Sequence, residues 1–506
     1  LDGDAMSILT SLLLLPLFGA LVVGFLPASN AKLVKQVALA FSLLVTLVSI
    51  VMALSFDRNN SAMQFTEVRT WISAFNINYA VGIDGMALVL ILTTTILVPV
   101  VFLAGWNESE NGRWNVKVFY ILLLILETMM IGVFSATDVF LFYVIFEAML
   151  LPVYFLIGGY GSGERAAAAM KFLLYSLFGG LLMLAAVIGL YIISVNQGGA
   201  TFDIARLSQL SIDSTTQNWL FLGFFIAFAI KAPLWPFHTW LPTAAKSATA
   251  GTSTLLLGVL DKVGTYGMIR FCMSFFPDAT KTFTPAIITL AVISILYGAF
   301  LAIGQKDINS LIAFTSISHF GFITLGIFAL TSQSLTGAIF YMVNHGFGTA
   351  ALFLTAGWMI KRRGSSQIAD FGGLQRVAPV LAWSFFIAGL SALALPGLSS
   401  FVSEFLVLLG AFAKYPVAAI LGTLGIILAA LYVLLAVQRA IHGETPASSA
   451  GISDLNLREK IAIAPVIAIL VLLGFYPKPA LEVINPTTQT IMTNAGVSDP
   501  VAKVVK

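Results

Sequence analysis

The stretch FIAFAIKAPLWPFHTWLP, residues 225–242, is the segment of this chain that says most about its fold. It continues an apolar run that begins at Trp219, and then places Lys231, two prolines and a histidine where the run is still apolar. A charged side chain at the centre of a membrane helix costs at least about 2.5–3.5 kcal/mol on insertion scales. A lysine kept at that cost, beside two residues that interrupt helices, is a candidate for function.

The rest of the chain is equally apolar. Of its 506 residues, 59% are hydrophobic and only 10% are charged, whereas about 25% are charged in ordinary soluble proteins. Apolar runs of about 20 residues recur from end to end, and each can cross a hydrocarbon core as a helix. The runs are continuous rather than alternating, which disfavours a transmembrane barrel. The sequence therefore predicts an all-α polytopic membrane protein, and it contains no basic stripe for nucleic acid.

We predict about 14 transmembrane helices with short loops between them. They span roughly 7–26, 34–55, 84–104, 116–134, 138–158, 168–194, 218–246, 251–274, 283–304, 308–330, 335–360, 379–412, 415–438 and 459–476. The helices at 218–246 and 379–412 are expected to be interrupted, at Pro233 and Pro236 and at Pro396 and Gly397. Two longer loops, 56–82 and 195–217, are expected to lie on the membrane surface as amphipathic pieces.

A faint internal repeat divides the chain. DVFLFYVIFEAML from Asp138 and DINSLIAFTSISH from Asp307 both open a span, and an interrupted helix follows in each half. An odd number of spans in each unit predicts two inverted five-helix repeats, and paired interrupted helices indicate a transport site at the bilayer midplane. The expected divisions are 1–112, 113–275 for the first repeat, 276–440 for the second, and 441–506 for the last helix and tail.

Several ionisable residues lie inside predicted spans. They are Glu147, Lys231, Lys262, His319, His345 and Glu404, with Glu127 and His238 as possible accessory groups. Burial favours the neutral forms of lysine and glutamate, so both can gain and release protons. The alternative for each is a packing role, because a buried pair can merely fix helix contacts. The number of these groups, and their alternation of acid, base and imidazole, favours a proton path.

The prolines explain why the helix near Lys231 should be broken. Each proline removes a backbone donor and leaves a carbonyl of the preceding turn unbonded. Irregular backbone at membrane depth persists only where protein or water satisfies it. We therefore expect loosened carbonyls and water near Lys231, with His238 continuing a hydrated line toward the inner face. The break at Pro396 is expected to place Glu404 beside a polar cavity.

The sequence shows no means of holding a cofactor. Its one cysteine, Cys272, excludes an iron–sulfur or cysteine-based zinc site built by this sequence. The glycine-rich segment GGYGSGE, residues 158–164, does not match a dinucleotide motif, and no P-loop is present. We therefore predict neither a cofactor nor a metal in this chain.

Five segments resemble the antiporter-like, proton-pumping membrane subunits of bacterial respiratory complex I, the NADH:quinone oxidoreductase. They are FYVIFEAMLLPVYFLIG, KAPLWPFHTWLP, GVLDKVGTYGMIRF, SISHFGF and LPGLSSFVSEF. The resemblance covers nearly the whole chain. At position 404 this chain has a glutamate, as in the M branch that it resembles, whereas the sister branches of the family usually have a lysine there. Departures include Phe146 in place of a common tryptophan, TAAKSA after HTWLP, and Asp261 beside Lys262.

This resemblance implies roles for the buried groups. Glu147 and Lys231 match the family's ion pair, Lys262 its central lysine and Glu404 its distal acid, while His319 and His345 match its connecting histidines. It also implies a translocase subunit of the respiratory electron-transport chain. Such a subunit moves protons and is driven by partner membrane-arm subunits, in a complex that contains flavin, iron–sulfur clusters and quinone. The alternatives are a subunit of a multisubunit sodium/proton antiporter and a membrane scaffold whose buried charges only set packing.

Loop charges predict the orientation. With the N-terminus outside, the inner loops carry about 15 lysine and arginine residues and the outer loops about 9, in agreement with the positive-inside rule. Both termini then face outward, and the resemblance implies the bacterial inner membrane. The first apolar run follows an acidic flank, so we expect a membrane helix rather than a signal peptide.

Overall fold

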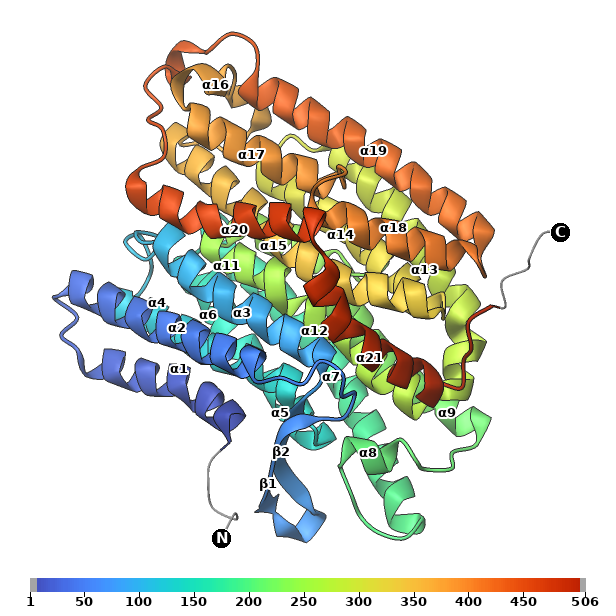
Figure 1. Cartoon of the computed structure of the whole chain (residues 1–506). Helices are drawn as coiled ribbons and strands as arrows, with labels where there is room; N and C mark the ends of the chain where they lie inside the picture. The colour runs from blue at the N-terminus through green and yellow to red at the C-terminus, as the bar shows by residue number, and fades with distance from the viewer. Residues whose placement is uncertain (1–6, 501–506) are drawn as a thin grey trace.

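The computed structural model describes residues 7–500, which form a bundle of long helices lying side by side (Figure 1). Most helices begin where a polar side chain accepts a hydrogen bond from the first turn, as Asn30, Asp84, Asn115 and Asp138 do. The first helices are α1 (Ile8–Phe25), α2 (Ala31–Leu54), α3 (Gly85–Ala104), α4 (Val116–Ser135), α5 (Val139–Ala148), α6 (Leu150–Tyr160) and α7 (Arg165–Asn196).

The central part of the chain contains the first interrupted helix and an irregular one. After the short α8 (Ile204–Leu207), α9 (Ser214–Lys231) and α10 (Trp240–Ser247) form the two halves of the predicted span 218–246. The next span consists of α11 (Ala250–Leu255), a π-helical segment at Leu256–Leu260, α12 (Lys262–Gly267) and a second π-helical segment at Met268–Met273. Single π-helical turns inside α-helices are frequent at functional sites.

The second half has the same plan. It contains α13 (Pro277–Gly304), α14 (Ile308–Phe328), α15 (Ser332–Arg363), the short α16 (Leu374–Val377), α17 (Pro379–Ala392), α18 (Ser399–Phe412) and α19 (Pro416–Ile441). α14 and α15 lie in the middle of the bundle, since 94% and 100% of their most apolar windows are buried. The predicted interruption of span 379–412 is confirmed, because the chain is not helical between Ala392 and Ser399.

The same local contact occurs once in each half. Val139 and Ile204 donate hydrogen bonds to Phe202 and Thr137, so Asp138 and Asp203 face each other as an isolated bridge. In the second half Ile308 and Ile368 donate to Ser366 and Lys306, around Asp307 and Gln367. Positions 137 and 139 are 169 residues before 306 and 308, which is the offset of the sequence repeat. This correspondence supports the repeat, while its exact boundaries stay a prediction.

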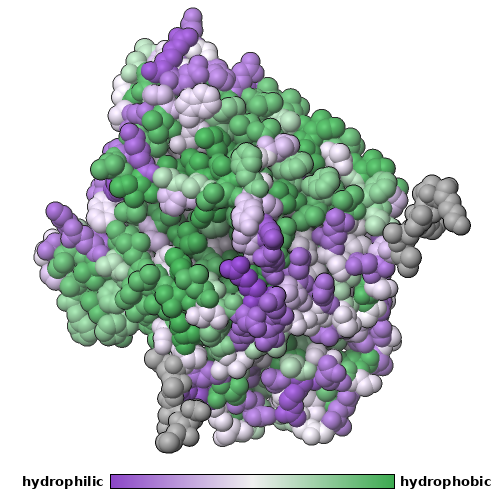
Figure 2. Space-filling view, in the orientation of Figure 1, coloured by the Kyte–Doolittle hydropathy of each residue, from purple (hydrophilic) through white to green (hydrophobic). Residues whose placement is uncertain are grey.

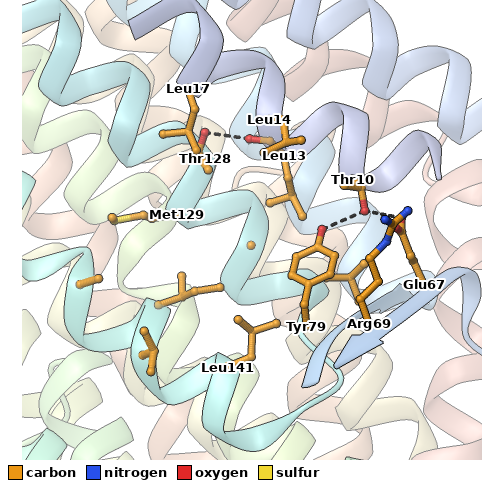
Figure 3. A pocket seen from close by; sticks show the side chains of 15 residues that line it. Thr10, Leu13, Leu14, Leu17, Glu67, Arg69, Tyr79, Thr128, Met129 and Leu141 are labelled. Atoms are coloured by element: carbon orange, nitrogen blue, oxygen red, sulfur yellow. Dashed lines mark hydrogen bonds and ion pairs between the residues drawn. The ribbon is translucent and has the colours of Figure 1, made fainter. Parts of the chain in front are cut away.

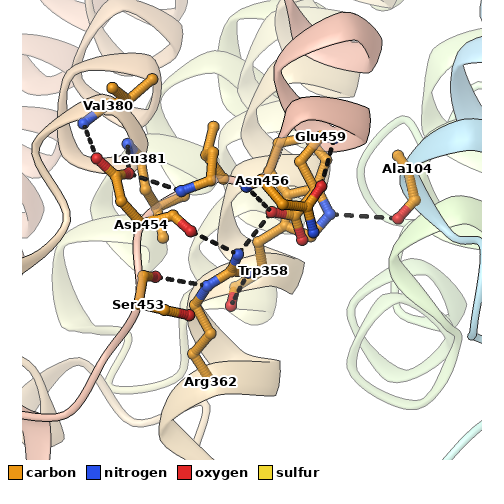
Figure 4. Close-up of polar contacts among 10 residues, drawn as sticks. Ala104, Trp358, Arg362, Val380, Leu381, Ser453, Asp454, Asn456 and Glu459 are labelled. Carbon is orange, nitrogen blue, oxygen red and sulfur yellow. Dashed lines mark hydrogen bonds and ion pairs between the residues drawn. The ribbon is translucent and has the colours of Figure 1, made fainter.

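The C-terminal part differs from the prediction. α20 (Leu457–Phe475) matches the last expected span, but it is followed by α21 (Lys478–Asn494), which bends away by 71° and was expected to be tail. α20 is fixed at one end by Arg362 at the end of α15 (Figure 4). The Arg362 guanidinium bonds to Glu459 at 2.5 Å and to the backbone carbonyls of Ser453 and Asp454.

The loop 56–82 is a β-hairpin rather than an amphipathic surface piece. β1 (Gln64–Ile72) pairs antiparallel with β2 (Ile77–Ile83), and the turn between them contains Asn76 in the left-handed conformation. The hairpin is attached to the bundle at Glu67, which accepts hydrogen bonds from the Thr10 hydroxyl at 2.6 Å and from Arg69 at 2.6 Å (Figure 3). Tyr79 also meets the Thr10 hydroxyl, at 2.8 Å.

The expectation for loop 195–217 was wrong as well. Phe202 and Leu207 are buried in the protein instead of facing a membrane surface, and Phe202 stacks on Tyr191 with ring centroids 4.8 Å apart. Apolar side chains instead cover the outside of the long helices, for example Phe18 on α1, Leu47 on α2 and Ile427 on α19, so the visible surface is largely apolar (Figure 2).

Some of the predicted spans are continuous helices and others are broken or irregular. Within residues 7–500, ten helices are long and apolar enough to cross a membrane, and the bent pair α20–α21 makes eleven. The further predicted spans 218–246, 251–274 and 379–412 are present as broken or irregular helices, each with shorter continuous segments. The molecule is therefore a multi-pass helical membrane protein, and the total of 14 stays a prediction.

Candidate functional site

Two carbonyls before the break at Pro233, those of Ala229 and Ile230, are bonded by groups other than the Lys231 ammonium. Pro233 cannot donate a hydrogen bond, so the Leu234 N–H bonds to the Ala229 carbonyl at 2.9 Å instead. The Trp240 indole donates to the Ile230 carbonyl at 2.8 Å. The interruption at Pro233 and Pro236 is confirmed, but the expectation that the loosened carbonyls would bind Lys231 was wrong.

Lys231 is buried and its amine has no hydrogen-bond partner among the described residues. Its Nζ lies 4.8 Å from the centroid of the Phe146 ring and 5.8 Å from that of Phe172, so the negative faces of two aromatic rings surround it. Glu147, the neighbour of Phe146 on α5, acts on Lys231 electrostatically, but no hydrogen bond joins them, since the Lys231 amine has no partner among the described residues. The predicted pair is open in this structure.

Glu147 occupies the last turn of α5, directly before the break at Met149 that separates α5 from α6. Its side chain fits only because residue 180 on α7 is a glycine. A Cβ atom at Gly180 would lie 1.6 Å from Oε1 of Glu147, and this oxygen is buried with no hydrogen-bond partner within residues 7–500. The carboxylate is therefore held in a tight space without polar contacts that fix it.

Lys262 lies where the helix widens into a π-helical turn. In such a turn the backbone hydrogen bond reaches five residues back along the chain instead of the four of an α-helix. The Asp261 N–H, for example, donates to the Leu256 carbonyl at 3.1 Å. The Lys262 ammonium bonds to the Leu257 carbonyl and lies 2.6 Å from Nδ1 of His345 on α15. This lysine–histidine contact is fully buried, and it is the shortest link between the two halves of the candidate site that the described residues provide.

Two histidines, His345 and His319, continue the series of side-chain contacts that begins at Lys262. The His345 and His319 rings meet edge to face, with centroids 5.3 Å apart. Nε2 of His319 lies 2.9 Å from the Ala392 carbonyl, which can only accept, so this nitrogen carries the proton. Ala392 is the last residue of α17 before the break, so His319 contacts the interrupted helix directly.

Glu404 lies on α18, just past the second break. Gly397 in that break has φ +96°, a conformation that favours glycine. Tyr341 on α15 donates a hydrogen bond to Oε1 of Glu404 at 2.8 Å, and Oε2 has no partner in the described part of the chain. The cleft of about 610 Å³ beside Glu404 is lined mainly by Leu, Phe and Ile side chains. The expectation of a polar cavity at Glu404 was therefore wrong.

The accessory residues differ in their surroundings. Glu127 on α4 is completely buried, and neither of its oxygens has a partner within residues 7–500, so it does not contact the other candidate groups. His238 is buried between the halves of span 218–246, with its ring 5.0 Å from that of Tyr297. A polar cavity of about 650 Å³ lies at the end of α10, lined by residues that include Thr243, Lys246 and Ser310.

We call the set Glu147, Lys231, Lys262, His345, His319 and Glu404 the buried row. Two residues that lie beside it were assigned no role from the sequence: Tyr341 was not named, and Asp261 was noted only as a departure from the resembling family. Tyr341 contacts Glu404, and its position four residues before His345 places both on one face of α15, which is a signal the sequence contains. Asp261 is fully buried next to Lys262. Within residues 7–500, no cluster of three histidine, cysteine or acidic residues could hold a metal ion.

The fold and the buried row define a class of protein: multi-pass helical membrane proteins whose interior contains a series of ionisable side chains. Residues 136–430 match the family described as "NADH:quinone oxidoreductase/Mrp antiporter, TM". The chain is also 47% identical to NADH-quinone oxidoreductase subunit M of Mycobacterium tuberculosis (strain ATCC 25618 / H37Rv), over 98% of this chain and 96% of that protein. The chain therefore belongs to this family.

Other similarities agree with this membership. The subunit M of Rhodobacter capsulatus is 38% identical, over 96% of this chain and 97% of that protein. A chain of respiratory complex I from Thermus thermophilus with bound NADH has a TM-score of 0.88 at 31% identity, and the match covers 97% of this chain and all of that one. A chain of the Mrp complex from Dietzia sp. DQ12-45-1b reaches 0.84 at 20% identity, over 97% and 100%, which shows a shared fold alone.

Proposed function

We propose that this chain is a proton-translocating membrane-arm subunit of an NADH:quinone oxidoreductase, and that the buried row carries the protons. The observation that supports this proposal most is the 2.6 Å contact between Lys262 and His345 at a fully buried position. It joins groups from the two predicted repeats, so a proton can be handed from one half of the chain to the other. The family membership supplies the complex in which this happens.

Each group in the row has a role that follows from its contacts. Lys231, without a hydrogen-bond partner among residues 7–500, is free to approach Glu147 or to move away from it. Lys262 donates to Nδ1 of His345, which is thereby placed to take up a proton. His319 and Tyr341 then connect His345 to Glu404 through ring contacts and one hydrogen bond. Glu404 releases the proton toward the outer side or a neighbouring subunit.

Access from the inner side is proposed along α10. The polar cavity near Thr243 and Lys246 lies at the end of α10. His238 does not line this cavity, but it lies between these residues and Lys231 in the sequence of the broken span. The segment TAAKSA, residues 243–248, which departs from the resembling family, contributes Thr243, Lys246 and Ser247 to the lining of this cavity. We place the protein in the bacterial inner membrane with both termini outward.

The chain needs an external energy source. Moving one charge against a membrane potential costs about 2.3 kcal/mol per 100 mV. We propose that redox chemistry in partner subunits, which hold flavin, iron–sulfur clusters and quinone, supplies it through contacts with other membrane-arm subunits. A subunit of a sodium/proton antiporter is the second candidate, favoured by the fold shared with the Mrp complex chain. Sodium-dependent proton exchange in the absence of NADH would support that candidate.

Replacing Lys262 by methionine tests the proposal. Methionine fills the same apolar space but cannot bind a proton, so we expect proton pumping by the assembled complex to fall about tenfold or more. Pumping is measured per NADH oxidised in liposomes that contain the purified complex. The matched control is Lys32→Met, because Lys32 is exposed. Unchanged pumping by an assembled Lys262→Met complex would overturn the proposed role of the row and favour a scaffold.

A further inference from the structure

Asp261 is a buried acid that the proposed path does not yet use. Its exposed fraction is 0%, and neither carboxylate oxygen has a hydrogen-bond partner in the described part of the chain. Leaving a buried carboxylate without partners is strongly unfavourable, and an apolar side chain of similar volume would pack at lower cost. An acid at this position is therefore not explained by packing.

The packing of the backbone around Asp261 shows which neighbouring helix this residue faces. Gly264 lies three residues later, on the same face of the helix. A Cβ atom at Gly264 would come within 2.5 Å of the Phe228 carbonyl oxygen and 2.6 Å of the Ala232 nitrogen, so this face packs directly against the end of α9. Lys231 is the residue immediately before Ala232, so Asp261 lies on the side of the helix that faces Lys231.

Lys262 points to a different neighbour. Successive residues of a helix are about 100° apart around its axis, and Lys262 contacts His345 on α15 rather than α9. The charged groups that act on Asp261 electrostatically are Lys262 and Lys231. Glu147 acts on Lys231 from α5 but is not among the groups that act on Asp261. The Asp261 carboxylate is therefore within electrostatic range of both lysines of the row, although neither of its oxygens has a hydrogen-bond partner in the described part of the chain.

We propose that Asp261 relays the proton from Lys231 to Lys262. The Lys231 ammonium loses a proton to the Asp261 carboxylate, giving a neutral amine and a carboxylic acid. The acid then loses this proton to a neutral Lys262 amine, which restores the carboxylate and forms the second ammonium. Each transfer is direct or passes through a bridging water. The relay rests on the proposed function, since it supplies the missing step between two groups of the buried row.

Asparagine at position 261 keeps the shape of the side chain but cannot exchange a proton, whereas glutamate can. For the complete complex in liposomes, we expect Asp261→Asn to lower pumping per NADH about tenfold, and Asp261→Glu to restore most of it. Asp57→Asn, in an exposed loop, is the control. We also expect turnover to produce the infrared carbonyl band of a protonated carboxyl group in the wild type, and Asp261→Asn to remove it.

The outcomes separate the relay from the function on which it rests. Normal pumping by Asp261→Asn, in a preparation where Lys262→Met is inactive, overturns the relay and leaves the proposed function in place. Normal pumping by both variants overturns the proposed function. If Asp261→Asn fails to assemble, the infrared band is sought in the wild type and in Asp261→Glu. Its absence from both overturns the relay, and its presence in both, shifted in Asp261→Glu, supports the relay.

Discussion

Lys231 and Lys262 are buried to the same degree, with exposed fractions of 1% each, but their contacts differ. Lys262 is held by the Leu257 carbonyl and by His345, whereas Lys231 meets aromatic faces and has no hydrogen-bond partner among the described residues. A buried charge with weak contacts has little to hold it in one position. Lys231 is therefore the group in the row that is best placed to move, and Glu147 is the acid of the row that acts on it electrostatically.

Replacing Glu147 by glutamine tests this switch. The amide is nearly the same size, so the complex should assemble, but it attracts the Lys231 ammonium far less than a carboxylate does. We expect proton pumping to fall about tenfold while the amount of assembled complex is unchanged. Glu444→Gln, at an exposed position, is the control. Full pumping by the Glu147→Gln complex would leave the pair with a structural role only.

Gly180→Ala tests the same carboxylate without changing any charge. The new methyl group would lie 1.6 Å from Oε1 of Glu147, so the flexible end of that side chain must move. We expect the complex to assemble and its pumping per NADH to fall several-fold, because the carboxylate is displaced from its position near Lys231. Gly158→Ala is the matched control, because its nearest neighbour is an Ala169 methyl group at an ordinary 3.5 Å. Equal pumping by both variants would show that the carboxylate position is unimportant.

At the scale of elements, the sequence predicted what depends on composition and proline, and missed what depends on contacts between distant segments. The breaks at Pro233 and Pro396 were predictable because proline cannot continue the hydrogen-bond ladder. The π-helical turn before Lys262 has no such local signal, since it is fixed by packing between helices. The orientation of Asp261 toward α9 depends on the close approach at Gly264, which also appears only in the folded chain.

The β-hairpin was also not predicted from the sequence, because it is attached to the bundle by contacts between distant segments, such as that of Glu67 with Thr10. This attachment leads to a prediction about pH. The hydrogen bond from the Thr10 hydroxyl lowers the pKa of the Glu67 carboxyl to about 2, below the ordinary value of about 4.3. A lowered pKa in the folded state stabilises the fold above pH 4.3, and this contribution is lost as pH falls toward 2. The attachment of β1 to α1 should therefore weaken in acid.

Hydrogen exchange of the hairpin amides, corrected for intrinsic rates, measures this effect. At neutral pH we expect the hairpin amides of Glu67→Gln to exchange faster than those of the wild type. The glutamine amide accepts hydrogen bonds from the Ser7 N–H, the Thr10 hydroxyl and Arg69 less well than the carboxylate does. The difference should shrink between pH 4 and pH 2 as the wild-type carboxylate is protonated. Asp57→Gln, in the preceding loop, should match the wild type. A difference that persists unchanged at low pH would show that the Glu67 charge does not hold the hairpin.

At the scale of the whole molecule, the buried row connects elements that are far apart in the sequence. Glu147 and Glu404 lie on α5 and α18, in different predicted repeats, and α14 and α15 carry the histidines between them. The bridges at Asp138 and Asp307 recur at the same positions in both halves, which supports two related units that meet at Lys262 and His345. A single site of this kind requires both halves to be present.

The orientation of the whole chain gives the last prediction. The β-hairpin and one long helix, α3, lie between Asn59 and Asn111. α3 has 20 residues, which span about 30 Å at 1.5 Å per residue. That length matches the hydrocarbon core, so the two loops lie on opposite sides of the membrane. From the excess of lysine and arginine we predict that the Asn111 loop lies inside and the Asn59 loop outside.

Single-cysteine labelling decides this orientation. Cys272 is the one cysteine of the chain and is buried, so Cys272→Ala gives a background without reactive thiols. On that background Asn59→Cys and Asn111→Cys add one exposed thiol each. With a membrane-impermeant maleimide we expect Asn59→Cys to be labelled in spheroplasts, and Asn111→Cys to be labelled only in inverted vesicles. The reverse pattern would turn the chain over, so that the cavity beside Lys246 would open outward and could not admit protons from the inner side.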